Sequence, residues 1–288
     1  MRSRLENAAL VVLLRRGQRA PQAYAELVEE AGSALAVLER EDLQQTLFDA
    51  DPDLDSTATE IATWEARGID LVSVLDPRYP ENLLAVHDRP PLLFVAGTPA
   101  PADARSVAVI GSRQASKDGI AAATEIAEHL VDCGYSVISG LAAGIDTAAH
   151  RAALERGGRT LAVIGTGLLR SYPPQNAELQ RQIATHCAVV SRFWPEAPPT
   201  RRSFPMRNAV MSGVSLGTVI VEASQTSGAR VQARLALAQG RPVFLLDALL
   251  EQQWARDLAT RAGTHVVHAP AEITATVERL TAAEPLSG

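Results

Sequence analysis

From Ile69 onward, the sequence alternates short apolar runs with amphipathic segments of about ten to fifteen residues. The runs 107–110 (VAVI) and 243–246 (VFLL) are apolar at every position rather than at every second one. Such strands are typical of a parallel sheet covered by helices on both faces. The sequence therefore predicts an α/β fold with a doubly wound, Rossmann-like parallel sheet. We expect strands over 92–95, 107–110, 136–139, 161–164, 188–191, 218–221, 243–246 and 265–267, and helices over 120–132, 145–155, 176–185, 229–239, 249–261 and 273–280.

The first 70 residues show helical spacing without strand signals. Asp51-Pro52-Asp53 indicates a turn between helices, and Arg67-Gly68 is typical of a helix end. We therefore expect a small helical domain over 1–70, followed by the Rossmann-like domain over 71–288. Three apolar stripes support the helices: Leu10, Leu13 and Leu14; Tyr24, Leu27 and Val28; and Leu35, Leu38 and Leu43.

Composition limits where a nucleic acid could bind. The net charge is −6 and the pI is near 5.6, so any basic site must be a local patch. Cys133 and Cys187 lack the spacing of a metal site. The apolar run 8–14 is ended by two arginines too early for a membrane span, and no signal-cleavage site follows it. We expect a cytoplasmic protein with no membrane segment.

Three glycine-bearing loops follow successive expected strands. They are Gly111-Ser112-Arg113, the Ser139-Gly140 loop, and the segment 165–167. Ligands of such sheets bind beyond the carboxyl ends of the strands, where backbone N–H groups at helix starts meet phosphates. One glycine loop can serve packing alone, but three together favour an anion-binding cleft.

A fourth segment, 200–208 (TRRSFPMRN), combines cations with an aromatic ring. Arginines that follow phosphates and a ring that stacks on a base are typical of single-strand binding. A surface loop with Phe204 in the core is the open alternative. We expect Arg113 and Arg207 to meet in one water-facing cleft, Arg207 coming from a loop. The expected nucleic-acid-binding residues are Gly111, Ser112, Arg113, Lys117, Ser139, Gly140, Arg201, Arg202, Phe204, Arg207 and Asn208.

Catalytic patterns are weak in this chain. Asp146 and His150 lie four residues apart, where a helix-start carboxylate supporting its loop is favoured over an acid–base pair. Glu222 follows a central strand, which is a plausible position for a general base. No Gly-x-Ser-x-Gly nucleophile motif occurs. We expect neither enzymatic activity nor a cofactor.

Several motifs together resemble the DNA-processing protein A (DprA/Smf) family, and they fall in that family's order across residues 76 to about 245. The matching motifs are Asp76-x-x-Tyr79-Pro80-x-x-Leu83, Val109-Ile110-Gly111-Ser112-Arg113, Ser139-Gly140-Leu141-Ala142-x-Gly144-Ile145-Asp146-x-x-Ala149-His150, Tyr172-Pro173-x-x-Asn176, Phe204-Pro205-x-Arg207-Asn208 and Ser227-Gly228.

The resemblance implies an extended Rossmann-like domain that forms a homodimer and binds single-stranded DNA in a basic pocket. It implies that the protein protects single strands and loads the RecA recombinase during DNA uptake, as in natural transformation, and in recombination. The family's pocket arginines match Arg113 and Arg207. A helical domain similar to sterile-alpha-motif folds precedes the core in many members and fits residues 1–70.

The chain departs from the family at several positions. Ala209 replaces an arginine after Asn208, Arg192 replaces a glutamate after Ser191, and Gln232 replaces a threonine. We also expect no winged-helix tail before Gly288. A nucleotide-binding sensor or nucleotide-processing enzyme, acting in phage defence, is the alternative. The Pro-Gly-Gly loop of nucleotide hydrolases and the three-glycine fingerprint of dehydrogenases are both absent.

Overall fold

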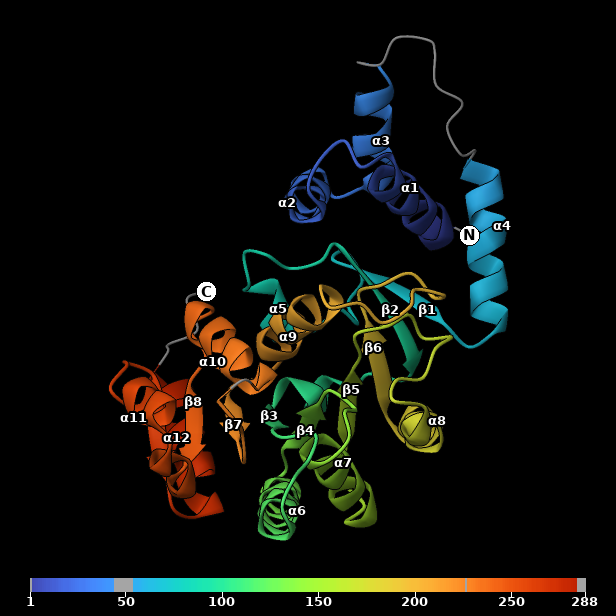
Figure 1. Cartoon of the computed structure of the whole chain (residues 1–288). Helices are drawn as coiled ribbons and strands as arrows, with labels where there is room; N and C mark the ends of the chain where they lie inside the picture. The colour runs from blue at the N-terminus through green and yellow to red at the C-terminus, as the bar shows by residue number, and fades with distance from the viewer. Residues whose placement is uncertain (1, 44–53, 226, 284–288) are drawn as a thin grey trace.

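The computed structural model describes residues 2–43, 54–225 and 227–283. Its strands form one sheet in the order β1-β2-β6-β5-β4-β3-β7-β8-β9, with helices on both faces (Figure 1). The expected doubly wound α/β architecture is confirmed. The strands are β1 (Asp70–Ser73), β2 (Leu92–Gly97), β3 (Ser106–Ile110), β4 (Ser136–Ser139), β5 (Thr160–Val163), β6 (Ala188–Ser191), β7 (Thr218–Ile220), β8 (Val243–Leu246) and β9 (Thr264–Val267).

The sheet is parallel from β6 to β9 but antiparallel at its other edge. There, β2 pairs antiparallel with β6, with Phe94 opposite Ser191, and β1 pairs antiparallel with β2. Strand β1 was not expected. It is only four residues long and has polar Asp70 and Ser73 at its ends, so it lacks the apolar run that marks the other strands. The purely parallel sheet of the sequence prediction is therefore wrong at this edge.

The helices follow the expected alternation in the second half of the chain with two differences: a helix over Ser203–Val214 was not expected, and one expected helix is split. The expected helix 249–261 is a 3₁₀ segment (Asp247–Glu251) followed by α11. The helices are α1 (Arg2–Arg16), α2 (Pro21–Ala31), α3 (Ala34–Asp42), α4 (Leu54–Ala66), α5 (Glu81–Leu84), α6 (Lys117–Asp132), α7 (Ile145–Glu155), α8 (Ala177–His186), α9 (Ser203–Val214), α10 (Gly228–Ala238), α11 (Gln253–Ala259) and α12 (Pro270–Ala283), with 3₁₀ turns at Pro101–Ala104 and Pro174–Asn176.

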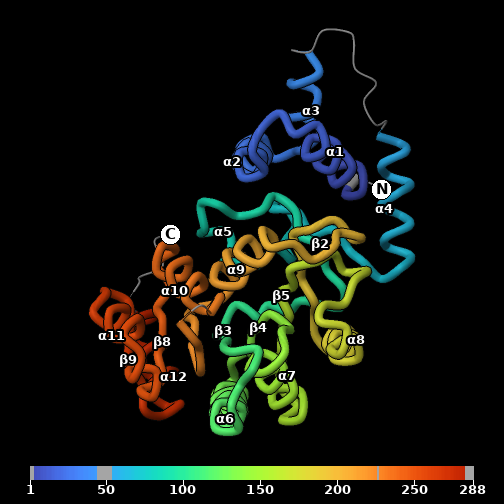
Figure 2. Tube along the Cα trace, in the orientation of Figure 1, coloured from blue at the N-terminus to red at the C-terminus, as the bar shows by residue number. Residues whose placement is uncertain are grey.

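The central strand β3 shows how the two faces are filled. Its odd-numbered residues Val107 and Val109 pack with α6, α7 and α12, while Ala108 and Ile110 face the cluster that contains α9 and α10. All four are buried, because successive side chains of a strand point to opposite faces and both faces are covered. Figure 2 shows the trace of these two helical layers.

Helices α1–α3 lie near the sheet edge that carries β1 and β2, and α4 leads into β1 (Figure 1). An aromatic cluster joins the two parts: the rings of Trp64 and Phe94 are 5.6 Å apart, and those of Phe94 and Trp194 are 5.5 Å apart. The apolar core is therefore continuous across residue 70, and the division into two domains stays a prediction.

The end of the predicted third apolar stripe differs from the sequence prediction. Leu43 is 88% exposed, so its assignment to this stripe is wrong, whereas Leu38 is buried as expected. The predicted Asp51-Pro52-Asp53 turn lies outside the described residues.

In the described ranges, no helix is both long enough and apolar enough to cross a membrane.

Candidate nucleic-acid interface

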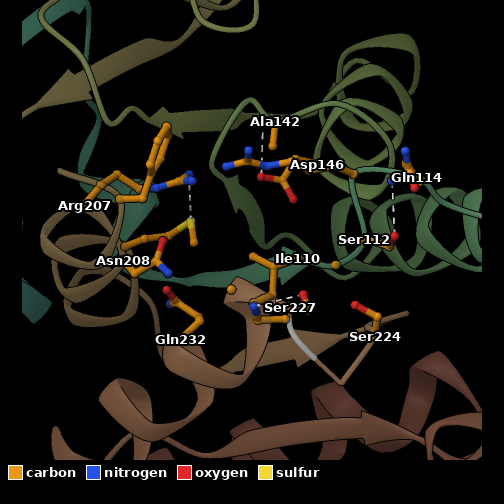
Figure 3. A pocket seen from close by; sticks show the side chains of 16 residues that line it. Ile110, Ser112, Gln114, Ala142, Asp146, Arg207, Asn208, Ser224, Ser227 and Gln232 are labelled. Carbon is orange, nitrogen blue, oxygen red and sulfur yellow. Dashed lines mark hydrogen bonds between the residues drawn. The ribbon is translucent and has the colours of Figure 1, made fainter. Parts of the chain in front are cut away.

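A pocket of about 530 Å³ opens at the carboxyl ends of β3 and β7 (Figure 3). From β3 the chain crosses to β4, β5 and β6 on one side, while β7, β8 and β9 lie on the other. The strand order therefore reverses between β3 and β7, which is the usual ligand position in open α/β sheets. We call this the switch-point pocket; it is lined by the Gly111–Gln114 loop, α9 and the start of α10.

The rim of the pocket carries an exposed cation on an aromatic ring. The Arg113 guanidinium lies 5.0 Å from the centre of the Phe204 ring, and the Tyr172 ring lies 5.7 Å from the same ring. Arg113 is exposed, Phe204 is half-buried and Tyr172 is 40% exposed. Tyr172 itself lines an adjoining hollow that shares Arg113 and Phe204 with the pocket. A cation and two rings placed in this way can contact the phosphate and the base of the same nucleotide.

The floor of the pocket carries a second arginine. Arg207 is only 6% exposed, and its Nη1 donates a hydrogen bond of 3.1 Å to the carbonyl oxygen of Val163. Its guanidinium lies directly over Gly140, where a Cβ atom would come within 1.3 Å of Nη1. Glycine at 140 therefore permits the close approach of Arg207.

The expectation that Arg207 faces water from a loop is wrong, because the segment forms helix α9. The backbone N–H of Thr200 donates to Ser203 Oγ (3.1 Å) and that of Ser203 donates to Thr200 Oγ1 (3.0 Å), so these two residues close the turn that leads into the helix. Pro205 lies in the first turn, where the absent N–H costs nothing. The helix then turns Arg207 inward.

The pocket floor contains three buried ionisable groups, Asp146, His150 and Arg207. Burial raises the pKa of Asp146 and lowers that of Arg207, and each charge partly offsets the shift of the other. Burial, with a contribution from Arg207, lowers the pKa of His150 to about 3, so its imidazole is neutral near pH 7.

The carboxylate of Asp146 supports the second glycine loop. It accepts hydrogen bonds from the N–H groups of Gly140 (3.1 Å) and Ala142 (3.3 Å), while His150 Nδ1 is bonded to Thr160 Oγ1 at 2.7 Å. These contacts agree with the expected supporting role of Asp146. The structure shows no hydrogen bond between Asp146 and His150, which an acid–base pair would need.

Helix α10 contributes its first turn to the pocket wall. Ser227 caps this helix by accepting a bond of 3.2 Å from the N–H of Ala229, as its sequence position indicates. Gln232 comes one turn later; it is fully buried against the pocket, and its amide has no hydrogen-bond partner among the described residues. A buried amide without a partner is costly, and sequence reasoning found Gln232 only as a departure from a motif.

Glu222, the plausible general base, is occupied by the start of α6. It accepts bonds from the N–H of Ser116 (3.0 Å) and from Ser116 Oγ (2.5 Å). Lys117 begins the same helix, is exposed, and does not line the pocket. No cluster of three or more histidine, cysteine, aspartate or glutamate residues in the described ranges is arranged to hold a metal ion.

The structure brings together most, but not all, of the residues singled out from the sequence. Ser139 is buried and donates its hydroxyl hydrogen bond to the carbonyl oxygen of Val109 (2.6 Å), so it serves the sheet rather than a ligand. Arg201 and Arg202 are exposed outside the pocket lining. Tyr172 was missed as a site residue, although its motif was noted. The expected residues that do line the switch-point pocket are Gly111, Ser112, Arg113, Phe204, Arg207 and Asn208, and Gly140 lines an adjoining hollow of about 180 Å³ with Tyr172.

Comparison with known proteins gives consistent matches. The DNA processing protein DprA of Streptococcus pneumoniae is 41% identical over 174 residues, which cover 60% of this chain and 61% of that protein. The chain thus spans less than two thirds of this relative's length. A solved structure of DprA from the same organism matches with a TM-score of 0.69 at 31% identity, covering 95% of this chain and 94% of that one.

A second solved structure shares the fold. DNA processing protein A of Helicobacter pylori, whose structure describes its single-stranded DNA binding mode, matches with a TM-score of 0.65 at 23% identity, over 73% of this chain and 96% of that one. The family model of DNA recombination-mediator protein A matches residues 70–283, from β1 to the end of the described chain. The chain therefore belongs to the DNA recombination-mediator protein A family.

Proposed function

We propose that the switch-point pocket binds single-stranded DNA. The observation that carries this proposal is the contact of exposed Arg113 with the Phe204 ring at the rim, next to the Tyr172 ring of the adjoining hollow. The guanidinium and the first N–H groups of α10 would hold phosphates, and the rings would stack on an unpaired base. Arg207 adds a positive charge beneath the bound phosphate.

The rings favour single strands over duplex. A stacking platform reaches a base only when that base is unpaired, whereas arginine–phosphate contacts form with either. Stacking is also tolerant of base identity, so we expect little base preference. The H. pylori relative, described as a single-stranded DNA binder, supports this assignment.

A second part of the proposal concerns the cellular role of the whole protein. We propose that the protein acts in the cytoplasm in DNA uptake and recombination, protects single strands, and delivers them to the RecA recombinase as a homodimer. The family membership supports a DNA-processing role. We also propose that no bond is made or broken, because Glu222, Asp146 and His150 are each engaged in holding the backbone or the core.

A nucleotide ligand is the second candidate function. A volume of about 530 Å³ lies within the range of small-molecule sites, and the buried amide of Gln232 has unused donors and an acceptor on the pocket wall. A bound nucleotide could supply hydrogen-bond partners for this amide without any DNA strand.

The test is a salt-dependent titration with single-stranded oligonucleotides, the matching duplex, and a panel of nucleotides. We expect tightest binding to the single strand, with affinity that falls steeply as salt rises. Arg151→Ala removes an exposed arginine from α7, outside the pocket lining, and is the matched control for Arg113→Ala. Equal affinity for duplex would contradict single-strand binding, and tight nucleotide binding alone would favour the second candidate.

A further inference from the structure

A second basic pocket, of about 440 Å³, lies between α10 and α11. Arg230 and Arg234 come from α10, and Arg261 follows α11. The lining contains one carboxylate, Asp257, and one aromatic residue, Trp254. We call this pocket the arginine groove. Three cations against one carboxylate make it positively charged, although the chain as a whole is acidic.

Two of the three cations are uncompensated. Arg234 and Arg261 are exposed, and neither guanidinium forms a hydrogen bond or an ion pair with another described residue. The Asp257 carboxylate accepts a hydrogen bond of 2.6 Å from Gln253 Nε2, so one of its oxygens is already engaged. Some other exposed arginines, such as Arg156, are by contrast paired with a carboxylate. The groove therefore presents free positive charge to an anionic ligand.

The third cation is held in place by the groove itself. The Arg230 guanidinium lies 5.6 Å from the centre of the Trp254 ring, and its Nη1 donates a bond of 2.5 Å to the carbonyl oxygen of Gln225. Trp254 is 6% exposed and donates its indole N–H to Gln252 Oε1 at 2.6 Å. A guanidinium fixed in this way loses little conformational freedom when it binds a phosphate.

The arginine groove continues directly from the switch-point pocket. Ser227, which caps α10, lines both, so the first turn of this helix is the wall between them. Arg230 and Arg234 follow on one face of α10, four residues apart, which corresponds to about 6 Å along the helix axis. This step is comparable to the distance between neighbouring phosphates of an extended single strand.

We propose that the arginine groove binds backbone phosphates of the same single strand that occupies the switch-point pocket. This inference rests on the proposed function and lengthens its binding site. The strand passes over the start of α10 and continues along Arg230, Arg234 and Arg261. Recognition there is by charge, so it depends on the length of the strand and not on its bases.

The test uses oligothymidylates of increasing length, from about 4 to about 16 nucleotides, the range of known single-strand sites. Binding of each is measured by fluorescence anisotropy for the full chain and for Arg234→Ala/Arg261→Ala. The longest strands should bind the variant about tenfold more weakly at low salt, and the salt slope should fall by about 1.4, since two phosphate contacts are lost. The shortest strands should bind both proteins equally.

The control is Arg40→Ala/Arg151→Ala, which removes the same charge from two exposed arginines that line neither pocket. It should leave the dependence on length unchanged. Melting curves of both double variants test whether they are folded. We expect both to fold, because all four substituted side chains are exposed.

Three outcomes overturn the inference. One is an equal loss in both double variants, which would indicate only general charge attraction. Another is a loss that is the same for short and long strands. The third is unchanged DNA affinity at every length with altered sedimentation, which would assign the groove to contact with a second copy of the chain. If no strand of any length binds the unaltered protein, the proposed function itself fails.

Discussion

The rim and the floor of the switch-point pocket each carry an arginine, but in opposite environments. Arg113 at the rim is exposed and rests on the Phe204 ring, whereas Arg207 at the floor is buried over Gly140 and bonded to the Val163 carbonyl oxygen. An exposed charge adds little to folding and is free for a ligand. A buried charge must be balanced by its surroundings, so removing it disturbs the fold.

This difference separates two roles that one residue type can have in the same pocket. The floor, with Asp146, Arg207 and His150, fixes the shape of the second glycine loop and of α9. Arg113 at the rim and the neighbouring Tyr172 are both exposed to solvent. Substitutions at the floor should change stability, and substitutions at the rim should change binding.

The largest expected effect is the response of the floor to acid. The pKa of His150 is about 3 in the folded protein, against an ordinary value of 6.5. Between these values the unfolded chain binds a proton that the folded protein excludes, so the stability falls as the pH is lowered through this interval. The loss is at most about 5 kcal/mol. Denaturant unfolding at a series of pH values measures it.

The raised pKa of Asp146 acts in the opposite direction in acid, because there the folded protein binds a proton before the unfolded chain does. The contribution of His150 is therefore taken from the difference between the unaltered protein and His150→Gln. Identical pH dependence in the two proteins would show that the imidazole is not held neutral.

The next largest effect is expected for Arg207→Ala. It leaves the Asp146 carboxylate without its balancing charge and the Val163 carbonyl oxygen without its donor, so the free energy of unfolding should fall by about 3 kcal/mol. Arg207→Met keeps most of the side-chain volume and should recover only the packing part of this loss. An unchanged melting temperature in Arg207→Ala would show that Arg207, like Arg113, does not stabilise the fold.

Arg113→Ala should show the reverse pattern. Its free energy of unfolding should change by less than about 0.5 kcal/mol, while binding of single-stranded DNA weakens by about 1–3 kcal/mol, the range for charge-assisted contacts. The salt slope should become shallower by about 0.7. Lys117→Ala, outside the pocket, is the comparison, and an equal loss there would remove the special role of Arg113.

The smallest effect is expected at the Tyr172 ring. Tyr172→Ala should weaken single-strand binding by about 1 kcal/mol through lost stacking, and Tyr172→Phe should restore it. Anisotropy titrations with a normal strand and with an abasic strand separate stacking from phosphate contact. A loss that persists with the abasic strand would show that the ring supports Phe204 rather than a base.

The sequence determined the larger part of the fold because its signals there are local. Continuous apolar runs such as 107–110 identify buried strands, and the glycine loops after them identify the ligand edge of a parallel sheet. Motif order identified the family and drew attention to Arg113 and Arg207 together. Strand β1 was missed because four residues with polar ends carry too short a pattern.

Tertiary structure alone decided what each site residue does. Pro205 and its neighbouring arginines indicate a loop locally, yet Thr200 and Ser203 close a turn that leads into α9, and this helix turns Arg207 into the core. The arginine groove likewise joins α10 to residues about thirty positions later, through packing against Trp254. Burial and charge balance depend on groups that are distant in the chain, so a residue type and its spacing specify the pocket but not which of its arginines is free to bind.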